Sequence, residues 1–127
     1  MKLFNKNIGG ANMETIALKT STSYNVLPEL RKIMDDSWIL KKVMVDYDTI
    51  SLPDEWNIKS YPVTLIFEES GREFAVKILS LSVGYGGSGP SDFSKLLEYF
   101  GISYCEDDIF TKKCKGKDNH IRLTYVK

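Results

Sequence analysis

The stretch YPVTLIFEESGREFAVKILSLSV, residues 61–83, gives the strongest indication of the fold. Its first half is rich in β-branched and aromatic residues, which favour a strand, and Pro62 falls at the start, where a strand tolerates proline. The turn-forming sequence ESGR at 69–72 then separates two apolar runs. We therefore predict a β-hairpin with strands over 61–70 and 73–83.

The second strand of this hairpin changes the face on which its apolar residues lie. Residues 74, 76 and 78 share one face, whereas residues 79, 81 and 83 have the opposite parity. One extra residue near Ile78-Leu79 would keep both sets directed inward. We therefore predict a β-bulge at this point.

The segments before the hairpin alternate between strand and helix patterns. ETIALKT (14–20) and ILKKVMVDYD (39–48) are predicted strands, because the first alternates apolar and polar residues and the second is rich in Ile and Val. Between them, apolar residues at helical spacing predict a helix over 23–34 with Ser23 as its N-cap. SLPDEWNI (51–58) has a proline and acidic residues near its start, which predicts a short helix.

After the hairpin, the glycine-rich loop GYGGSGP leads into a helix predicted over about 91–100. Either Ser91 is the N-cap of this helix or Pro90 is its first residue. IFTKKCK and HIRLTYVK flank GKDN, which predicts a terminal β-hairpin. The expected organisation is a lead-in at 1–12 with a turn at Gly9-Gly10, a domain at 13–101 and a hairpin extension at 102–127.

The composition excludes several classes of protein. The chain has 127 residues, 43% of them apolar, which suits one globular domain. Lys and Arg together number 17 and so do Asp and Glu, so no net field attracts nucleic acid or anionic membranes. No apolar run approaches the length of a membrane span, and MKLFNKNIGG lacks the apolar core of a secretory signal. A cytoplasmic protein without a cofactor is the expectation.

The order strand–helix–strand–helix–strand–strand–helix resembles the thioredoxin/glutaredoxin superfamily. Tyr61-Pro62-Val63 resembles the cis-proline motif of that family, and Pro28 stands five residues beyond Ser23, as a proline follows the second cysteine of the family's Cys-x-x-Cys pair. Gly86-Gly87-Ser88 before Asp92 is similar to the glutaredoxin element that holds the glutathione carboxylate. The resemblance implies an α/β, thioredoxin-like fold with a mixed four-stranded sheet and three helices.

The chain departs from that family where the cysteines would stand, because it has Thr20 and Ser23 there. An alcohol has no thiolate form near neutral pH and cannot exchange disulfides. The resemblance therefore implies a redox-inactive binding module whose groove holds a peptide or a small zwitterionic or anionic ligand, without catalytic residues. The expected ligand-binding residues are Thr20, Ser23, Tyr24, Tyr61, Pro62, Val63, Gly86, Gly87, Ser88, Ser91 and Asp92.

Each part of this groove also has a purely structural interpretation. Residues 20–23 could merely cap a helix, Tyr61-Pro62 could be a trans proline at a strand end, and the glycines could allow a tight crossing from strand to helix. If the groove is real, the three segments meet at one edge of the molecule. The resemblance implies a cis Tyr61–Pro62 bond, which would leave the backbone N–H and C=O of Tyr61 free to pair with an extended peptide.

Two alternative functions involve the C-terminal extension. Cys105 and Cys114 could form the redox pair of an atypical thiol–disulfide oxidoreductase, or be two structural thiols, and neither is expected at a helix N-terminus. The terminal hairpin could instead add a strand to a protein partner, as in a phage or host-defence factor, or to its own copy. His120 is expected on the surface, and no metal site is predicted. A monomer or a homodimer is expected.

Overall fold

The computed structural model describes residues 2–8, 11–113 and 118–127, and the side chains of 13–113 and 118–127. The predicted turn at Gly9-Gly10 lies outside the described residues. The chain runs through β1 (Lys2–Ile8), β2 (Ala11–Leu18), α1 (Val26–Ile33), β3 (Ile39–Asp48), β4 (Val63–Glu69), β5 (Arg72–Ile78), α2 (Ser88–Tyr99), α3 (Glu106–Phe110) and β6 (His120–Val126).

The strands form one mixed sheet in the order β1-β2-β5-β4-β3-β6. The β2 and β5 strands are parallel, and every other neighbouring pair is antiparallel. The predicted α/β class is confirmed, but the four-strand count is wrong, since the sheet has six strands. The two additional strands come from the ends of the chain: the lead-in pairs with β2, and β6 pairs with β3.

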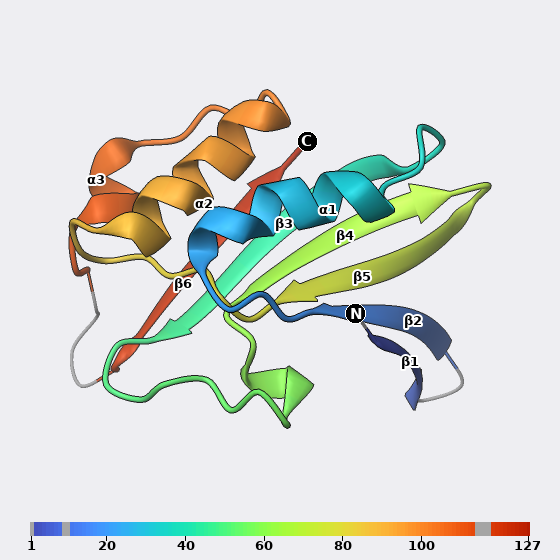
Figure 1. Cartoon of the computed structure of the whole chain (residues 1–127), viewed down its shortest axis with the longest axis horizontal. Helices are drawn as coiled ribbons and strands as arrows, with labels where there is room; N and C mark the ends of the chain where they lie inside the picture. The colour runs from blue at the N-terminus through green and yellow to red at the C-terminus, as the bar shows by residue number, and fades with distance from the viewer. Residues whose placement is uncertain (1, 9–10, 114–117) are drawn as a thin grey trace.

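The three helices lie on one face of the sheet (Figure 1). Inward-facing residues of the strands, such as Val43, Leu65 and Val76, belong to one buried cluster with Leu30 of α1, Phe93 of α2 and Ile109 of α3. In the described part of the chain, no helix contributes to the opposite face. The described residues therefore form two layers, with helices over one side of the sheet and none of the described helices over the other.

The predicted hairpin at 61–83 is present as β4 and β5, but the bulge is elsewhere. The β5 strand ends at Ile78, and Leu81 and Val83 are buried in the segment that crosses toward the helices. The change of parity thus marks the end of a strand. The register shift in this sheet lies in β3, between Leu40 and Lys42.

The helix predicted over 51–58 is absent, and a single 3-10 turn occurs at Ile58–Ser60. Side chains capture the backbone amides that a helix would need: Asp54 Oδ1 accepts from the N–H of Trp56 at 2.9 Å, and Asn57 Oδ1 accepts from the N–H of Lys59 at 3.1 Å. Such local bonds compete with helix formation. The chain therefore lacks the second helix that the resemblance to thioredoxin implies.

The remaining helices begin at other residues than predicted. The first opens with a 3-10 turn at Ser23–Asn25 and becomes α-helical at Val26, and Ser23 caps no amide. The α2 helix begins at Ser88 after Gly87, so Ser91 is not its N-cap and Pro90 is not its first residue. Pro90 is the third residue, where its missing N–H costs no intrahelical bond.

The C-terminal extension is not a hairpin. Residues 106–110 form α3, whose Ile109 is fully buried, and among the described residues after α3 the one strand is β6. Ile109 belongs to the same buried cluster as Leu30 of α1 and Phe93 of α2, so this segment packs on the helix side of the sheet and does not pair with β6. The β6 strand extends the main sheet beside β3.

Candidate functional site

Two of the three predicted groove segments meet, and they bind each other. Ser23 Oγ donates a hydrogen bond to Asp92 Oδ2 at 2.6 Å, which joins the start of the first helix to α2. The carbonyl of Thr20 accepts a hydrogen bond from the Ser80 hydroxyl. The polar atoms expected to hold a ligand carboxylate or ammonium are thus engaged within the fold. Tyr24, by contrast, is exposed.

The glycine loop serves the packing of α2. A Cβ on Gly89 would lie 1.9 Å from Ser82 Oγ, and Ser82 Oγ is hydrogen-bonded to the Tyr85 hydroxyl at 2.7 Å. Gly84 has a φ of +95°, and its N–H donates to the Ile109 carbonyl at 2.7 Å. The loop matches the structural interpretation, a close approach of the chain to the helix start. Gly86, Gly87 and Ser88 are exposed beside it.

The third segment is arranged differently from the prediction. The described chain contains no cis peptide bond, so Tyr61–Pro62 is trans and the expected cis-proline is wrong. The N–H of Tyr61 donates to the Ile58 carbonyl at 3.2 Å, and the Tyr61 hydroxyl donates to the Glu55 carbonyl at 2.6 Å. That amide is therefore not free to pair with a peptide. Val63, at the start of β4, is fully buried.

The cavities near these segments do not unite them. Pro62 lines a small polar cavity of about 130 Å³ with Asp46, Asp48 and His120, among others. Thr20 lines a separate cavity with Ser21 and residues of α1. Neither cavity is lined by residues from all three predicted segments. These two cavities therefore do not join the three segments into one site, and the groove stays a prediction.

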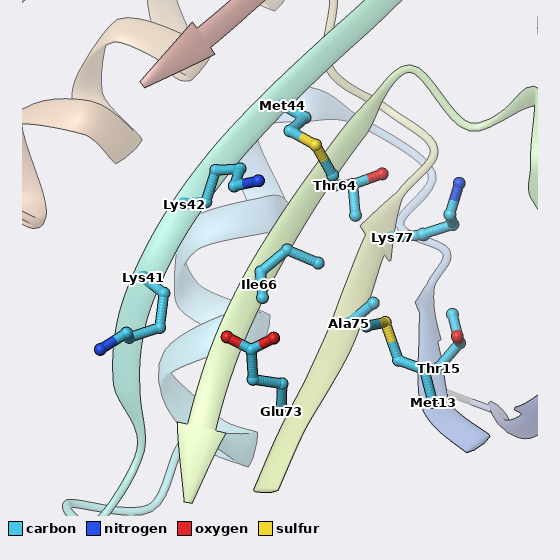
Figure 2. Close-up of a pocket in the computed structure, with 10 residues that line it drawn as sticks. All are labelled: Met13, Thr15, Lys41, Lys42, Met44, Thr64, Ile66, Glu73, Ala75 and Lys77. Atoms are coloured by element: carbon cyan, nitrogen blue, oxygen red, sulfur yellow. The ribbon is translucent and has the colours of Figure 1, made fainter. Parts of the chain in front are cut away.

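A larger concave feature than these two cavities lies on the helix-free face of the sheet, and sequence reasoning did not single it out. It is a depression of about 550 Å³ that we call the sheet depression. Figure 2 shows its side chains rising from four neighbouring strands. Its lining residues are Met13, Thr15, Lys41, Lys42, Met44, Thr64, Ile66, Glu73, Ala75 and Lys77.

Strand register explains why these residues gather. Thr15 of β2 pairs with Ala75 of β5, Ala75 pairs with Ile66 of β4, and Ile66 pairs with Lys42 of β3. Residues paired across neighbouring strands have side chains on the same face. One row of side chains therefore crosses four strands. The small side chains of Thr15 and Ala75 leave the hollow, and Ile66 lies in its middle (Figure 2).

The rim of the sheet depression is mostly basic. Three lysines, Lys41, Lys42 and Lys77, line it with one acid, Glu73. Lys41 also forms an ion pair with Glu68 at 3.2 Å, and Lys77 has an interaction partner too, so neither is counted as free. Figure 2 shows lysines on both sides of Ile66. The arrangement suits a ligand with an apolar body and negative groups at its margin.

A sequence signal for this face exists in the run VTLIF of β4. All of these residues are buried, with Thr64 9% and Ile66 8% exposed, although only alternate ones face the helices. A continuous apolar run is typical of a strand covered on both faces. Here the second face has no covering element among the described residues. The run therefore marks β4 as a strand with buried residues on both faces, but the sequence does not say which strands lie beside it.

The residues of the alternative functions lie apart from the sheet depression. Cys105 is exposed and occupies the N-cap position of α3, contrary to the prediction for both cysteines, whereas Cys114 lies outside the described residues. His120 is half-buried and its Nδ1 lies 2.5 Å from Asp46 Oδ1. Within residues 13–113 and 118–127, no three His, Cys, Asp or Glu side chains are placed to hold a metal ion.

Comparison with known proteins gives no relative for this chain: no family model, curated protein or solved structure matches it. Across the described residues, none of the helices has both the length and the apolar character needed to cross a bilayer.

Proposed function

We propose that this chain is a non-catalytic binding module, and that its helix-free sheet face holds a polypeptide segment that combines apolar side chains with carboxylates. The observation that carries the proposal is the sheet depression, an apolar hollow of about 550 Å³ with a lysine-rich rim. Hollows of this size are typical of ligand sites. The proposal keeps the binding role expected from the sequence and assigns it to another surface.

The floor and walls of the depression suit apolar side chains. Ile66, Thr64 and Ala75 form a floor that is already largely shielded from water, and Met13 and Met44 stand beside it. Methionine side chains are flexible and polarisable, so they adapt to ligands of irregular shape. A partner's apolar side chains would therefore replace weakly bound water with close contacts at little cost in reorganisation.

The rim selects the charge of the ligand. Lysine ammonium groups at the edge of an apolar hollow attract carboxylates, which speeds association and disfavours basic partners. The lining residues include no His, Cys or Ser, so a Ser–His or Cys–His pair is not available among them. These two features support binding rather than covalent chemistry at this surface.

A fluorescent probe, anilinonaphthalene sulfonate, tests the proposal because it joins an apolar ring system to an anion. We expect it to bind the folded protein with enhanced fluorescence. Lys42→Glu reverses one rim charge and should weaken binding by about tenfold, which corresponds to about 1.4 kcal/mol. Lys32→Glu makes the same charge change on exposed α1 and should leave affinity unchanged. Absence of binding, or equal weakening by both variants, contradicts the proposal.

The other functions considered from the sequence stay predictions. An oxidoreductase would need Cys105 and Cys114 together, and the second lies outside the described residues. Strand addition would act at β6, which forms one edge of the sheet, although not through the predicted hairpin. Membership of the thioredoxin superfamily also stays a prediction, and the trans Tyr61–Pro62 bond and the missing second helix count against it.

A further inference from the structure

Residues 49–57, which connect β3 to the 3-10 turn before β4, present large apolar side chains to solvent. We call this segment the apolar loop. Ile50 is 69% exposed, Leu52 93% and Trp56 81%. Three large apolar side chains are thus exposed on one short loop, and exposed apolar residues that gather in this way mark interaction sites. Trp is also among the residues that contribute most to binding energy at protein interfaces.

The apolar loop is held in a defined shape by its own polar groups. Asp48 Oδ1 accepts hydrogen bonds from the N–H groups of Ile50 at 3.0 Å and Ser51 at 3.3 Å. Ser60 Oγ accepts from the N–H of Asp54 at 2.8 Å and donates to backbone carbonyls of the same segment. A loop fixed before binding loses less conformational entropy when it binds. The exposed side chains are therefore presented ready for contact.

The charge of the apolar loop is negative. Asp54 and Glu55 are exposed next to Trp56, and residues 49–57 contain no Lys or Arg. Outside the loop, Lys19 Nζ lies 4.7 Å from the centre of the Trp56 ring. Carboxylates beside the exposed apolar residues disfavour an anionic membrane as the partner. They favour an apolar hollow with a basic rim.

The sheet depression is such a hollow, and it lies on the same chain. We propose that the apolar loop of one copy of this protein occupies the sheet depression of a second copy. This inference rests on the proposed function, for which it names the partner. Trp56 and Leu52 would enter the hollow over Ile66, and the carboxylates of Asp54 and Glu55 would meet the lysines of the rim.

The geometry makes this contact one between copies. The apolar loop projects from the end of the sheet (Figure 1), whereas the depression lies on its face, and no residue of 49–57 lines the depression. Each contact uses one loop and one depression, so both partners keep one free surface. The proposal takes this heterologous arrangement, in which each copy contacts two others and rings or open chains form, and not the reciprocal exchange of loops in a two-fold dimer. Association should therefore grow with concentration beyond two copies.

Sedimentation velocity on two complementary variants tests the inference. Leu52→Ser with Trp56→Ser removes the loop's apolar side chains, and Lys42→Glu with Met44→Glu disables the depression. The wild type should form species larger than dimers as its concentration rises, whereas each double variant alone stays monomeric. An equimolar mixture should form dimers and stop there, because only one intact loop and one intact depression can pair. Tyr24→Ser changes another exposed aromatic residue and should associate like the wild type.

Three results overturn the inference: a wild type that is monomeric at the highest concentration, a double variant that associates like the wild type, or a mixture that stays monomeric. Circular dichroism of each variant confirms that the fold is retained. Binding of anilinonaphthalene sulfonate tests the proposed function separately from this inference. The variant Leu52→Ser with Trp56→Ser keeps an intact sheet depression, so it should still bind the dye. If that variant binds the dye while no copies associate, the binding face stands and only the choice of partner fails. If it does not bind the dye, both fail.

Discussion

At the scale of single residues, the glycine loop shows why a sequence motif needs its surroundings. Gly89 lies where the start of α2 meets Ser82, and Gly86 lies in open space. The two glycines look alike in the sequence GYGGSGP. Of these two, Gly89 has no room for a side chain and Gly86 does. The close approach of the Ser82 and Tyr85 side chains to the helix start accounts for the glycine at position 89.

Gly89→Ala should therefore destabilise the protein by about 1–3 kcal/mol, because the added methyl group displaces the Ser82 hydroxyl and its bond to Tyr85. Gly86→Ala adds the same group without a contact and should change the free energy of unfolding by less than about 0.5 kcal/mol. Urea unfolding of both variants measures the contrast. Equal stabilities would show that the loop does not require glycine at position 89.

Tyr125 provides a second test at this scale. Its hydroxyl is buried and has no hydrogen-bond partner among the described residues. Burial, with a smaller effect of the Asp108 carboxylate, raises the pKa of Tyr125 from 10.0 to about 12. The folded state thus favours the neutral phenol. The stability that results is fully present below the pKa of Tyr125 in the unfolded state. It is lost as the pH rises through the pKa of Tyr125 in the folded state.

Tyr125→Phe removes the unpaired hydroxyl and the ionisable group together. We expect the variant to be about 1 kcal/mol more stable at neutral pH, since an unsatisfied buried polar group is costly. It should also lose less stability than the wild type when the pH lies between the two pKa values. Unfolding curves of both proteins, at neutral pH and at a pH between the two pKa values of Tyr125, measure this. If the variant lost as much stability at the alkaline pH as the wild type, the prediction would be refuted.

At the scale of elements, the hydrogen bond from Ser23 to Asp92 ties the first helix to α2. We interpret it as part of the fold rather than of a ligand site. Ser23→Ala should cost about 1–2 kcal/mol of stability, because a bond to a charged group is lost. Ser21→Ala, on an exposed neighbour, is the control.

Ser23→Ala also distinguishes the groove predicted from the sequence from the sheet depression as the ligand site. Ser23→Ala should leave binding of the dye unchanged, because Ser23 does not line the sheet depression. Thermal unfolding and the dye titration are measured on the same sample. A variant with full stability and weakened binding would return the ligand site to the predicted groove.

Elements with local causes were predictable from the sequence. The β4–β5 hairpin follows from its apolar runs and the turn at 69–72, where Ser70 and Gly71 both have positive φ. The prediction of a helix at 51–58 was wrong, because Asp and Asn side chains, which favour a helix start, also accept hydrogen bonds from nearby backbone N–H groups and form turns. The terminal hairpin was wrong because burial of Ile109 depends on contacts with distant parts of the chain.

At the scale of the whole molecule, the uncovered sheet face is the decisive feature. Its residues come from four strands whose order cannot be read from the sequence, so neither the depression nor its lysine rim was predictable as a unit. The resemblance to thioredoxin directed attention to the loops at one end of the sheet. There the polar groups proved to be bound to one another, and the uncovered surface lies elsewhere.

The most direct test of the binding face is a map of backbone amide chemical shifts during titration of the isotope-labelled protein with anilinonaphthalene sulfonate. The account predicts saturable shifts centred on Ile66, Met44 and Ala75, with little change at Ser23, Gly87 or Asp92. Shifts centred on the second group, or no saturable shifts at the first, would contradict it.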